Sequence, residues 1–183
     1  MIAGVNGAGK STLYQSMPEL QKMPRVNSDE IVREFGSWKE KKDVIAAGKI
    51  AVKKIAQNFE LGKTFNQETT LCGKSIIRNI RYAKQKGYIV EVHYVGLDSA
   101  EIAKNRVQAR VDKGGHGIPE MDIEKRYIET FKNLKIVLPE CNLIIFYDNT
   151  KIFRRFAIYK NGVPMRISHD VPEWFYRHVW NEK

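Results

Sequence analysis

Eight residues near the start of the chain have the spacing of a phosphate-binding loop. Gly4, Gly9, Lys10 and Ser11 occupy the fixed positions of the Walker A pattern, G-x-x-x-x-G-K-S, after an apolar strand and before a helix. Glycines let the backbone wrap around phosphates, so that several N–H groups converge on them, and the following helix presents its positive end. The sequence therefore predicts a site for the phosphates of ATP or GTP.

The loop residues have distinct expected roles. The residues expected to bind the nucleotide are Asn6, Gly7, Ala8, Gly9, Lys10, Ser11 and Thr12. Lys10 would place a positive charge between the β- and γ-phosphates, and the Ser11 hydroxyl would be a Mg²⁺ ligand. A Walker loop alone fits a kinase, an ATPase, a GTPase or a motor. A chain of 183 residues favours a small kinase, because motor and switch proteins usually carry more chain.

Three carboxylates follow expected strands, at the sheet edge where open α/β folds bind ligands. Asp29 could orient an attacking hydroxyl and accept its proton, or could be an ordinary acid at a helix start. Glu68 could bind acceptor hydroxyls, hold a Mg²⁺-bound water, or belong to a helix N-cap region. Asp98 is expected mainly to cap a helix.

Arginines on both sides of a glycine-rich segment indicate a lid. Arg106 and Arg110 are one turn apart on one helix face, residues 114–119 break that helix, and Arg126 lies on the next one. Closure would bring guanidinium groups onto the transferring phosphoryl group and exclude water. The alternative is that each arginine is simply solvated. His116, at the tip of the segment, is a candidate contact to phosphate.

Strand-like and helix-like segments alternate along the chain, which is typical of a parallel sheet covered by helices. Five strands are expected, at residues 2–5, 25–27, 64–68, 88–96 and 143–147. Helices are expected from residue 10, from residue 28 with Ser28 as N-cap, and at about 44–61, 74–86, 99–113 and 122–137. Asn161-Gly162 predicts a hairpin turn between residues 155–160 and 163–167, and residues 172–180 a last helix.

The fold prediction is thus α/β: a doubly wound, mostly parallel five-stranded sheet of the P-loop kinase type. One domain is expected to span residues 1–183, with a helical lid at about 106–126 and a C-terminal hairpin and helix at about 153–180. No role is assigned to the hairpin.

Composition narrows the class of protein. The hydrophobic share of 43% and charged share of 28% are ordinary for a soluble globular protein, and apolar stretches such as residues 143–146 are too short to span a bilayer. The first residues lack the pattern of a signal peptide. Two cysteines, Cys72 and Cys141, form no CxxC pattern, which favours a reducing cytoplasm over a disulfide framework or a zinc site.

A net charge of +10 predicts attraction to anions without selecting one. Much of the charge lies on helices, as at residues 39–42 and 53–54, where a solvated face is the commoner explanation. A nucleic-acid-stimulated NTPase is therefore a rival, but the chain has no RNA-binding motif and no basic stripe with interleaved aromatics.

Several pieces, in order along residues 1–150, resemble the zeta toxin family of P-loop kinases, especially its short bacterial members. These pieces are residues 3–12, 26–31, 68–71, 87–88, 92–95, 106–110, 115–119, 133–134 and 147–149. The Walker piece is generic, whereas the ordered set is fairly specific. The chain is shorter than the larger members, whose extra helices around the sugar are largely missing.

The resemblance implies a kinase that uses ATP and Mg²⁺ and phosphorylates a sugar hydroxyl of UDP-N-acetylglucosamine or a related nucleotide sugar. It also implies a small antitoxin partner. Asp29 matches the family's general base, Glu68 its acceptor-binding acid and Lys10 its Walker lysine; Thr69 and His116 are also expected near the acceptor. The family has two phosphate-binding arginines. The first matches Arg106 or Arg110 of this chain, and the position of the second falls near His116 or is taken over by Arg126. A kinase for a nucleoside, nucleotide or antibiotic hydroxyl, and a binding module without catalysis, are the alternatives.

Overall fold

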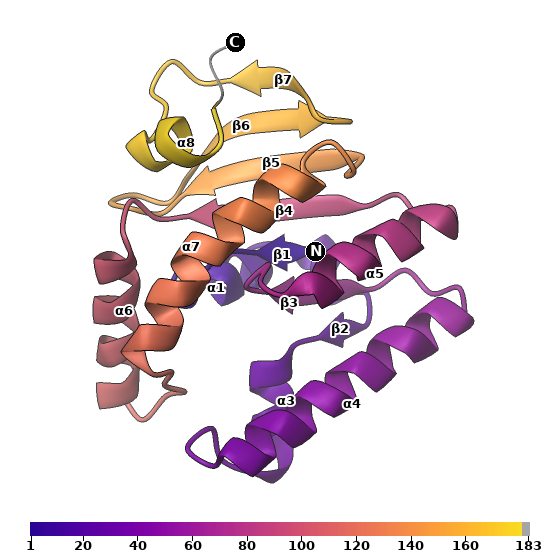
Figure 1. Ribbon diagram of the computed structural model, residues 1–183, viewed down its shortest axis with the longest axis vertical. Helices are drawn as coiled ribbons and strands as arrows, with labels where there is room; N and C mark the ends of the chain where they lie inside the picture. The colour runs from indigo at the N-terminus through magenta and orange to yellow at the C-terminus, as the bar shows by residue number, and fades with distance from the viewer. Residues whose placement is uncertain (181–183) are drawn as a thin grey trace.

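A seven-stranded sheet runs through the molecule, in the spatial order β2-β3-β1-β4-β5-β6-β7 (Figure 1). This computed structural model describes residues 1–180. The strands are β1 (Ile2–Ala3), β2 (Arg25–Val26), β3 (Asn66–Thr69), β4 (Glu91–Gly96), β5 (Leu143–Asp148), β6 (Arg154–Lys160) and β7 (Val163–Ile167). The first five pair in parallel, whereas β6 and β7 are antiparallel.

Helices lie on both sides of the sheet. They are α1 (Lys10–Gln15), α2 (Pro18–Gln21), α3 (Ser28–Phe35), α4 (Lys41–Glu60), α5 (Lys74–Gln85), α6 (Ala100–Asp112), α7 (Glu120–Val137) and α8 (Glu173–His178). In Figure 1, α5 and α7 cover the near face and α1 the far face, while α6 stands at the edge formed by the carboxyl ends of β4 and β5. The predicted α/β fold with a mostly parallel sheet is confirmed.

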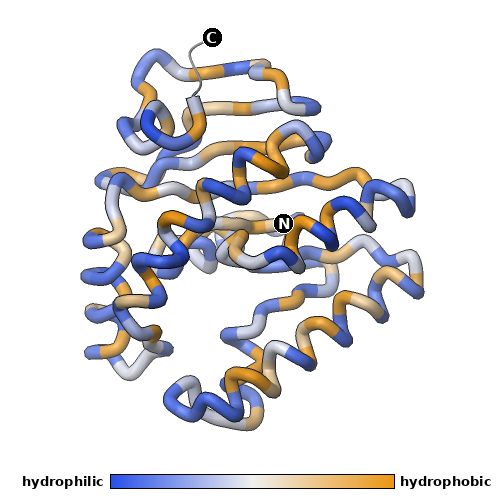
Figure 2. The backbone as a smooth tube through the Cα atoms, in the orientation of Figure 1, coloured by the Kyte–Doolittle hydropathy of each residue, from blue (hydrophilic) through white to orange (hydrophobic). Residues whose placement is uncertain are grey.

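Apolar side chains in the central strands explain why the sheet forms here. Val92, Tyr94, Ile144 and Phe146 are all buried, and Figure 2 shows that apolar stretches run along β4 and β5. Parallel strands with helices on both faces bury both of their faces, which favours such near-continuous apolar runs. The alternation of strands and helices along the chain thus makes the strands parallel and places the carboxyl ends of several strands along one edge, beside the Walker loop.

The hairpin that had no assigned role extends the sheet. β6 pairs with β5, and α8 closes over it, so that Trp174 and Phe175 are fully buried. The indole Nε1–H of Trp174 donates a hydrogen bond of 3.0 Å to Asp148 Oδ1, at the end of β5. The sheet therefore has seven strands where five were expected, because the C-terminal segment shares its core.

Helices α3 and α4 form a smaller core of their own. It consists of Val26, Ile31, Val32, Ala47 and Ile55. This packing fixes the start of α3, and with it Asp29, next to the end of β2.

Two local predictions were wrong, and one short helix was not predicted. The N-cap of α3 is Asn27 and not Ser28: Asn27 Oδ1 accepts a hydrogen bond of 2.9 Å from the Asp29 backbone N–H, whereas Ser28 is the exposed first residue of the helix. The following helix begins at Lys41, three residues before the predicted start, because a polar first turn precedes its apolar positions. The short α2 was not predicted. In contrast, Ser99 caps α6 as expected, accepting a hydrogen bond from the Ile102 N–H.

Within residues 1–180, no helix is long and apolar enough to cross a membrane.

Candidate functional site

The Walker loop leads from β1 into α1 at the carboxyl edge of the sheet. Gly9 has φ +100°, and a Cβ at this position would lie 2.5 Å from Asn149 Nδ2, so any side chain here would be strained and would collide. The Asn149 Nδ2–H in turn donates a hydrogen bond of 2.9 Å to the Ala8 carbonyl. The loop after β5 therefore supports the phosphate loop from outside.

Lys10, the first residue of α1, is buried under the loop, and its Nζ donates a hydrogen bond of 3.2 Å to the Val5 carbonyl. Burial lowers the pKa of this ammonium group, and the nearby Arg110 and Arg126 lower it further, whereas Glu68 and Asp29 act in the opposite direction. The cavity beside Lys10 has more cationic than acidic side chains in its lining, which suits an anion: Lys10, Arg25, Arg33, Arg106 and Arg110 against Asp29, Glu30 and Glu68.

Two neighbouring cavities adjoin Lys10. The first, of about 400 Å³, is lined by the phosphate loop, Arg106 and Arg110. The second, of about 370 Å³, is lined by Thr69, Thr70 and Arg126 among others. The residues that line both cavities are Asn6, Lys10, Asn27, Asp29 and Glu68. The predicted nucleotide and acceptor residues, apart from Ala8 and His116, therefore lie around two spaces that share one wall.

Glu68 lies in that wall at the end of β3, with 7% of its side chain exposed. It accepts hydrogen bonds from Ser11 Oγ at 3.2 Å and from Asn27 Nδ2 at 3.1 Å, and it forms an ion pair with Arg25. Arg25 also pairs with Glu30. The contact with Ser11 places Glu68 on the nucleotide side; its predicted binding of the acceptor stays a prediction.

Ser11 Oγ and Glu68 Oε1 are hard oxygen donors of the kind that Mg²⁺ takes, so these residues fit the predicted ion. Among residues 1–180, no group of three or more His, Cys, Asp or Glu side chains is arranged to hold a metal. Mg²⁺ commonly binds through one or two protein ligands together with substrate phosphates, so the fit does not require such a group.

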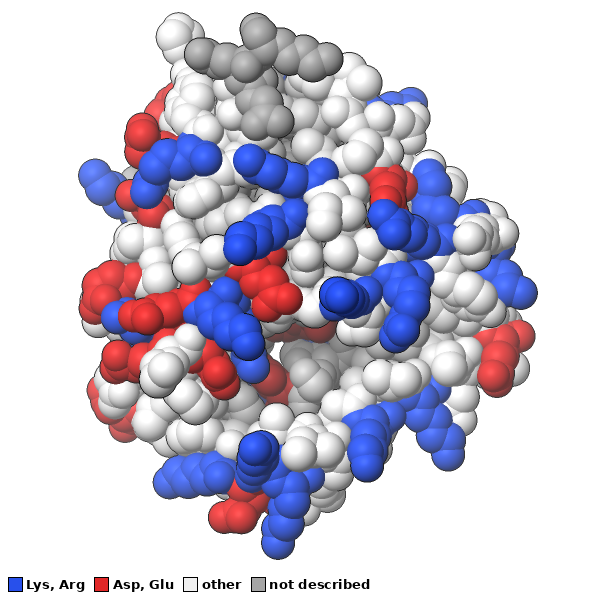
Figure 3. All heavy atoms as spheres, viewed as in Figure 1, with Lys and Arg blue, Asp and Glu red and all other residues white. Residues whose placement is uncertain are grey.

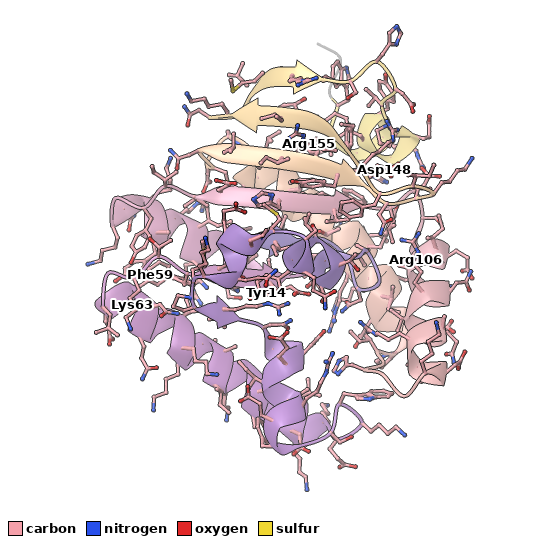
Figure 4. All side chains as sticks on the ribbon, turned by 180° about the vertical axis from the view of Figure 1, so that it is seen from behind. Tyr14, Phe59, Lys63, Arg106, Asp148 and Arg155 are labelled. Atoms are coloured by element: carbon pink, nitrogen blue, oxygen red, sulfur yellow. The ribbon has the colours of Figure 1, made fainter. Side chains whose placement is uncertain are left out.

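The three arginines predicted from the lid pattern all reach the cavities. Arg106, on α6 beside the sheet edge, donates to the Thr150 carbonyl at 3.2 Å (Figure 4). Arg126 Nη1 donates to Asn6 Oδ1 at 3.0 Å. Within the described residues, the buried Nη1 of Arg106 and the buried Nε and Nη2 of Arg110 have no hydrogen-bond partner. Buried donors without partners are costly, and both side chains belong to residues that line the first cavity.

Burial lowers the pKa of Arg110 from its ordinary value, with Arg33 acting in the same direction and Asp29 and Glu68 opposing. Whether Arg106, Arg110 and Arg126 contact the transferring phosphate stays a prediction.

Asp29 and His116 are brought together by the fold. Asp29 Oδ1 lies 3.6 Å from His116 Nε2, and 32% of the Asp29 side chain is exposed. His116 was expected at phosphate or acceptor; in the structure it lies beside the carboxylate of Asp29 and the ring of Trp38, 5.6 Å away between ring centroids. Asp98 was expected mainly to cap a helix, but Ser99 is the N-cap of α6, and the Asp98 carboxylate instead pairs with Arg177.

Sequence reasoning missed Arg25 and Trp38. A signal for Arg25 was present in the sequence. Arg25 is two residues before Asn27, and residues two apart on a strand face the same side, so both could be expected at the site. For Trp38 there was none, since its contact with the loop between α6 and α7 joins segments far apart in the chain.

The buried histidine predicts a pH dependence of stability. Burial lowers the pKa of His116 below its ordinary value of 6.5, and Arg110, Arg33 and Arg126 act in the same direction against Asp29. The unfolded chain therefore binds a proton at this histidine more readily than the folded protein does. The stability that the protein owes to a neutral His116 is fully present above pH 6.5 and is lost as the pH falls through the folded-state pKa. The free energy of unfolding of the wild type, relative to a His116→Gln variant, should decrease between about pH 7.5 and about pH 5.

Urea unfolding of both proteins across this range measures the difference. His178, whose pKa burial also lowers, is present in both and cancels. A constant difference would contradict the prediction.

Comparison with known proteins identifies the domain type. A family model described as AAA domain, AAA_33, matches residues 1–133. An uncharacterized protein of Haemophilus influenzae is 34% identical over 124 residues, covering 68% of this chain and 88% of that protein.

Solved structures share the fold. The crystal structure of AvrRxo1-ORF1:-ORF2 with ATP aligns with a TM-score of 0.71 and 14% identity, covering 97% of this chain; this chain spans 62% of that one. A structure from the PezAT chromosomal toxin-antitoxin system of Streptococcus pneumoniae aligns with a TM-score of 0.59 and 18% identity, covering 83% of this chain and 69% of that one.

At these identities the likeness shows the fold alone, an α/β domain with a mostly parallel sheet. The matching family model does not carry the zeta toxin name, so the resemblance to zeta toxins is supported at the level of the P-loop domain and its fold. Because the model covers well over half of the chain, the protein belongs to the AAA-domain family AAA_33.

Proposed function

We propose that the protein is an ATP-dependent kinase that transfers the γ-phosphate to a hydroxyl group of a small acceptor. The observation that carries this proposal is the shared wall of the two cavities: Lys10 and Asp29 both face the first cavity and the second. In this proposal the first cavity holds the nucleotide and the second the acceptor, so that a cation for the phosphate and a carboxylate for the hydroxyl stand between them, as in-line phosphoryl transfer requires.

In this proposal the nucleotide phosphates bind the loop of residues 6–12, and Lys10, Arg106 and Arg110 balance their charge. Asp29 accepts the proton of the acceptor hydroxyl. Ser11 would hold Mg²⁺, and Mg²⁺ when bound neutralises charge on the phosphates. Arg126, between Asn6 and the second cavity, would stabilise the transferred phosphoryl group.

The acceptor we propose is UDP-N-acetylglucosamine or a related nucleotide sugar. The resemblance to zeta toxins suggests this class, and the second cavity offers polar groups for sugar hydroxyls at Gln67, Glu68, Thr69 and Thr70. A nucleoside, a nucleotide or an antibiotic would use the same chemistry and is the alternative acceptor class.

A small protein partner belongs to the proposal as well. The solved structures that share the fold come from the AvrRxo1-ORF1:-ORF2 complex and from a toxin-antitoxin system. We infer that an antitoxin could hold this kinase inactive. A nucleic acid is a weaker candidate: Figure 3 shows Lys and Arg scattered over the near face rather than gathered in a stripe, with many Asp and Glu on the side of α6 and α7.

The test is transfer of labelled γ-phosphate from ATP, with Mg²⁺, to UDP-N-acetylglucosamine and to a panel of nucleosides, nucleotides and aminoglycosides. Lys10→Ala serves as the inactive control. Labelled UDP-N-acetylglucosamine that forms with the wild type and not with the control would support the proposal in full. Label on another compound of the panel would keep the kinase and change the proposed acceptor to that compound. ATP binding without transfer to any member would refute the kinase.

A further inference from the structure

The loop between α6 and α7 holds a histidine inside the protein. The His116 side chain is 6% exposed, and its Nε2 lies 3.6 Å from Asp29 Oδ1. Within residues 1–180, no other Lys, Arg or His nitrogen lies within 4.0 Å of this carboxylate. The proposed base therefore has one close cationic or donor side chain, and that side chain comes from the lid.

Glycines on either side of the histidine permit this approach. A Cβ on Gly117 would lie 2.5 Å from Trp38 Cη2 and 2.8 Å from Val111 Cγ2. A Cβ on Gly115 would lie 2.6 Å from Arg110 Cγ and 2.9 Å from the Arg110 carbonyl oxygen. All four distances are shorter than a Cβ atom can approach another heavy atom, so only glycine at these two positions allows the loop to pack against α6 and Trp38 at once.

Trp38 ties the loop to the element that carries the base. It lies between α3 and α4, whereas His116 lies between α6 and α7, and their ring centroids are 5.6 Å apart. Asp29 is in the first turn of α3. The contact thus joins the two sides of the first cavity, and opening the lid would separate His116 from Asp29.

We propose that His116 is a positioning residue for Asp29: with the lid loop closed, its Nε2–H holds one carboxylate oxygen, so that the other faces the acceptor hydroxyl. This inference rests on the proposed function, since it assigns Asp29 the role of base. The present spacing of 3.6 Å exceeds a hydrogen bond, and such bonds in unliganded enzymes often tighten when substrate binds.

The charges around His116 suit a neutral donor. Asp29 and Arg33 face it from α3, Arg110 from α6 and Arg126 from α7. Burial and the three arginines lower its pKa, while Asp29 opposes them. A neutral imidazole with its proton on Nε2 donates to Asp29 without taking away the negative charge that makes Asp29 a base.

Steady-state kinetics test the positioning role. His116→Ala should lower kcat for phosphate transfer by about 10- to 100-fold, as misplacement of a reacting group does, with the Kd for ATP unchanged. His116→Gln, whose amide N–H can also donate, should restore part of the rate. His169→Gln, at an exposed histidine beyond the hairpin, is the matched control. An unchanged kcat in His116→Ala, or a loss confined to ATP affinity as a phosphate contact would give, overturns the proposal.

A titration that needs no catalysis separates the two proposals. The His116 imidazole signal, assigned by its loss in His116→Gln, is followed by NMR against pH in the wild type and in Asp29→Asn. Because Asp29 raises the pKa of His116, its removal should shift the titration to lower pH. If the titration shifts but the wild type phosphorylates no acceptor, the proposed kinase function is refuted and the pairing of His116 with Asp29 stands. If the titration does not shift but the wild type is an active kinase, the pairing is overturned and the proposed function stands.

Discussion

Asparagine in place of Asp29 should lower kcat for phosphate transfer by about 10²- to 10⁴-fold, because an amide cannot accept the proton of the attacking hydroxyl. The change removes little else. Among residues 1–180, no cationic nitrogen lies closer to the Asp29 carboxylate than His116 Nε2 at 3.6 Å, and the hydrogen bond that the Asp29 backbone N–H donates to Asn27 is kept. Affinity for ATP should therefore stay close to that of the wild type, since in the proposed arrangement the loop and the arginines bind the phosphates.

The matched control is Asp122→Asn. Asp122 is an exposed acid in the first turn of α7, so the control makes the same loss of charge at a helix start, worth about 0.3–1 kcal/mol of stability, away from both cavities. Single-turnover transfer and fluorescent ATP-analogue binding measure the two effects separately. Transfer by Asp29→Asn at the wild-type rate would remove the role of base from Asp29.

Alanine in place of Trp174 should lower the free energy of unfolding by about 3–5 kcal/mol, the usual cost of emptying a large buried aromatic site. Trp174 is 0% exposed and packs against Tyr94, Phe131, Phe156 and Phe175. A loss of this size is a large share of the about 5–15 kcal/mol that stabilises a typical domain. Thermal and urea unfolding measure it.

Two further variants divide the effect. Trp174→Phe keeps most of the ring but loses the hydrogen bond to Asp148, and should cost less, with about 1 kcal/mol from the bond itself. Trp180→Ala, at a half-buried tryptophan that packs on Phe175, is the control for removing an indole and should cost less than Trp174→Ala. Equal stability of Trp174→Ala and the wild type would mean that the hairpin and α8 are not part of the core.

Local pattern was sufficient for the phosphate loop and the order of the elements. The Walker spacing, the apolar run of β4 and the turn at Asn161-Gly162 each depend on neighbouring residues, so they could be read without knowing the fold. The predicted N-cap of α3 was one residue too late. Asn27 and Ser28 are both residue types that cap helices well, and only backbone geometry chooses between them.

The environment of the carboxylates could not be read in this way. Glu68 was expected to bind acceptor hydroxyls, to hold a Mg²⁺-bound water or to belong to a helix N-cap region, and local pattern could not choose among these. Its partners come from two other segments: Ser11 from α1, and Arg25 and Asn27 from β2 and the residue after it. These contacts depend on the parallel pairing of β2 with β3 and of β3 with β1, which places the ends of the three strands side by side.

By itself, the sequence determined that the chain has a Walker loop, a mostly parallel sheet and arginines flanking a glycine-rich segment, because these features are written in short-range spacing. Only the tertiary structure decided that the hairpin joins the sheet, that Glu68 lies beside Ser11, and that His116 turns toward Asp29. The physical reason is that burial and charge pairing depend on distances between segments far apart in the chain, and the packing of the whole domain sets those distances.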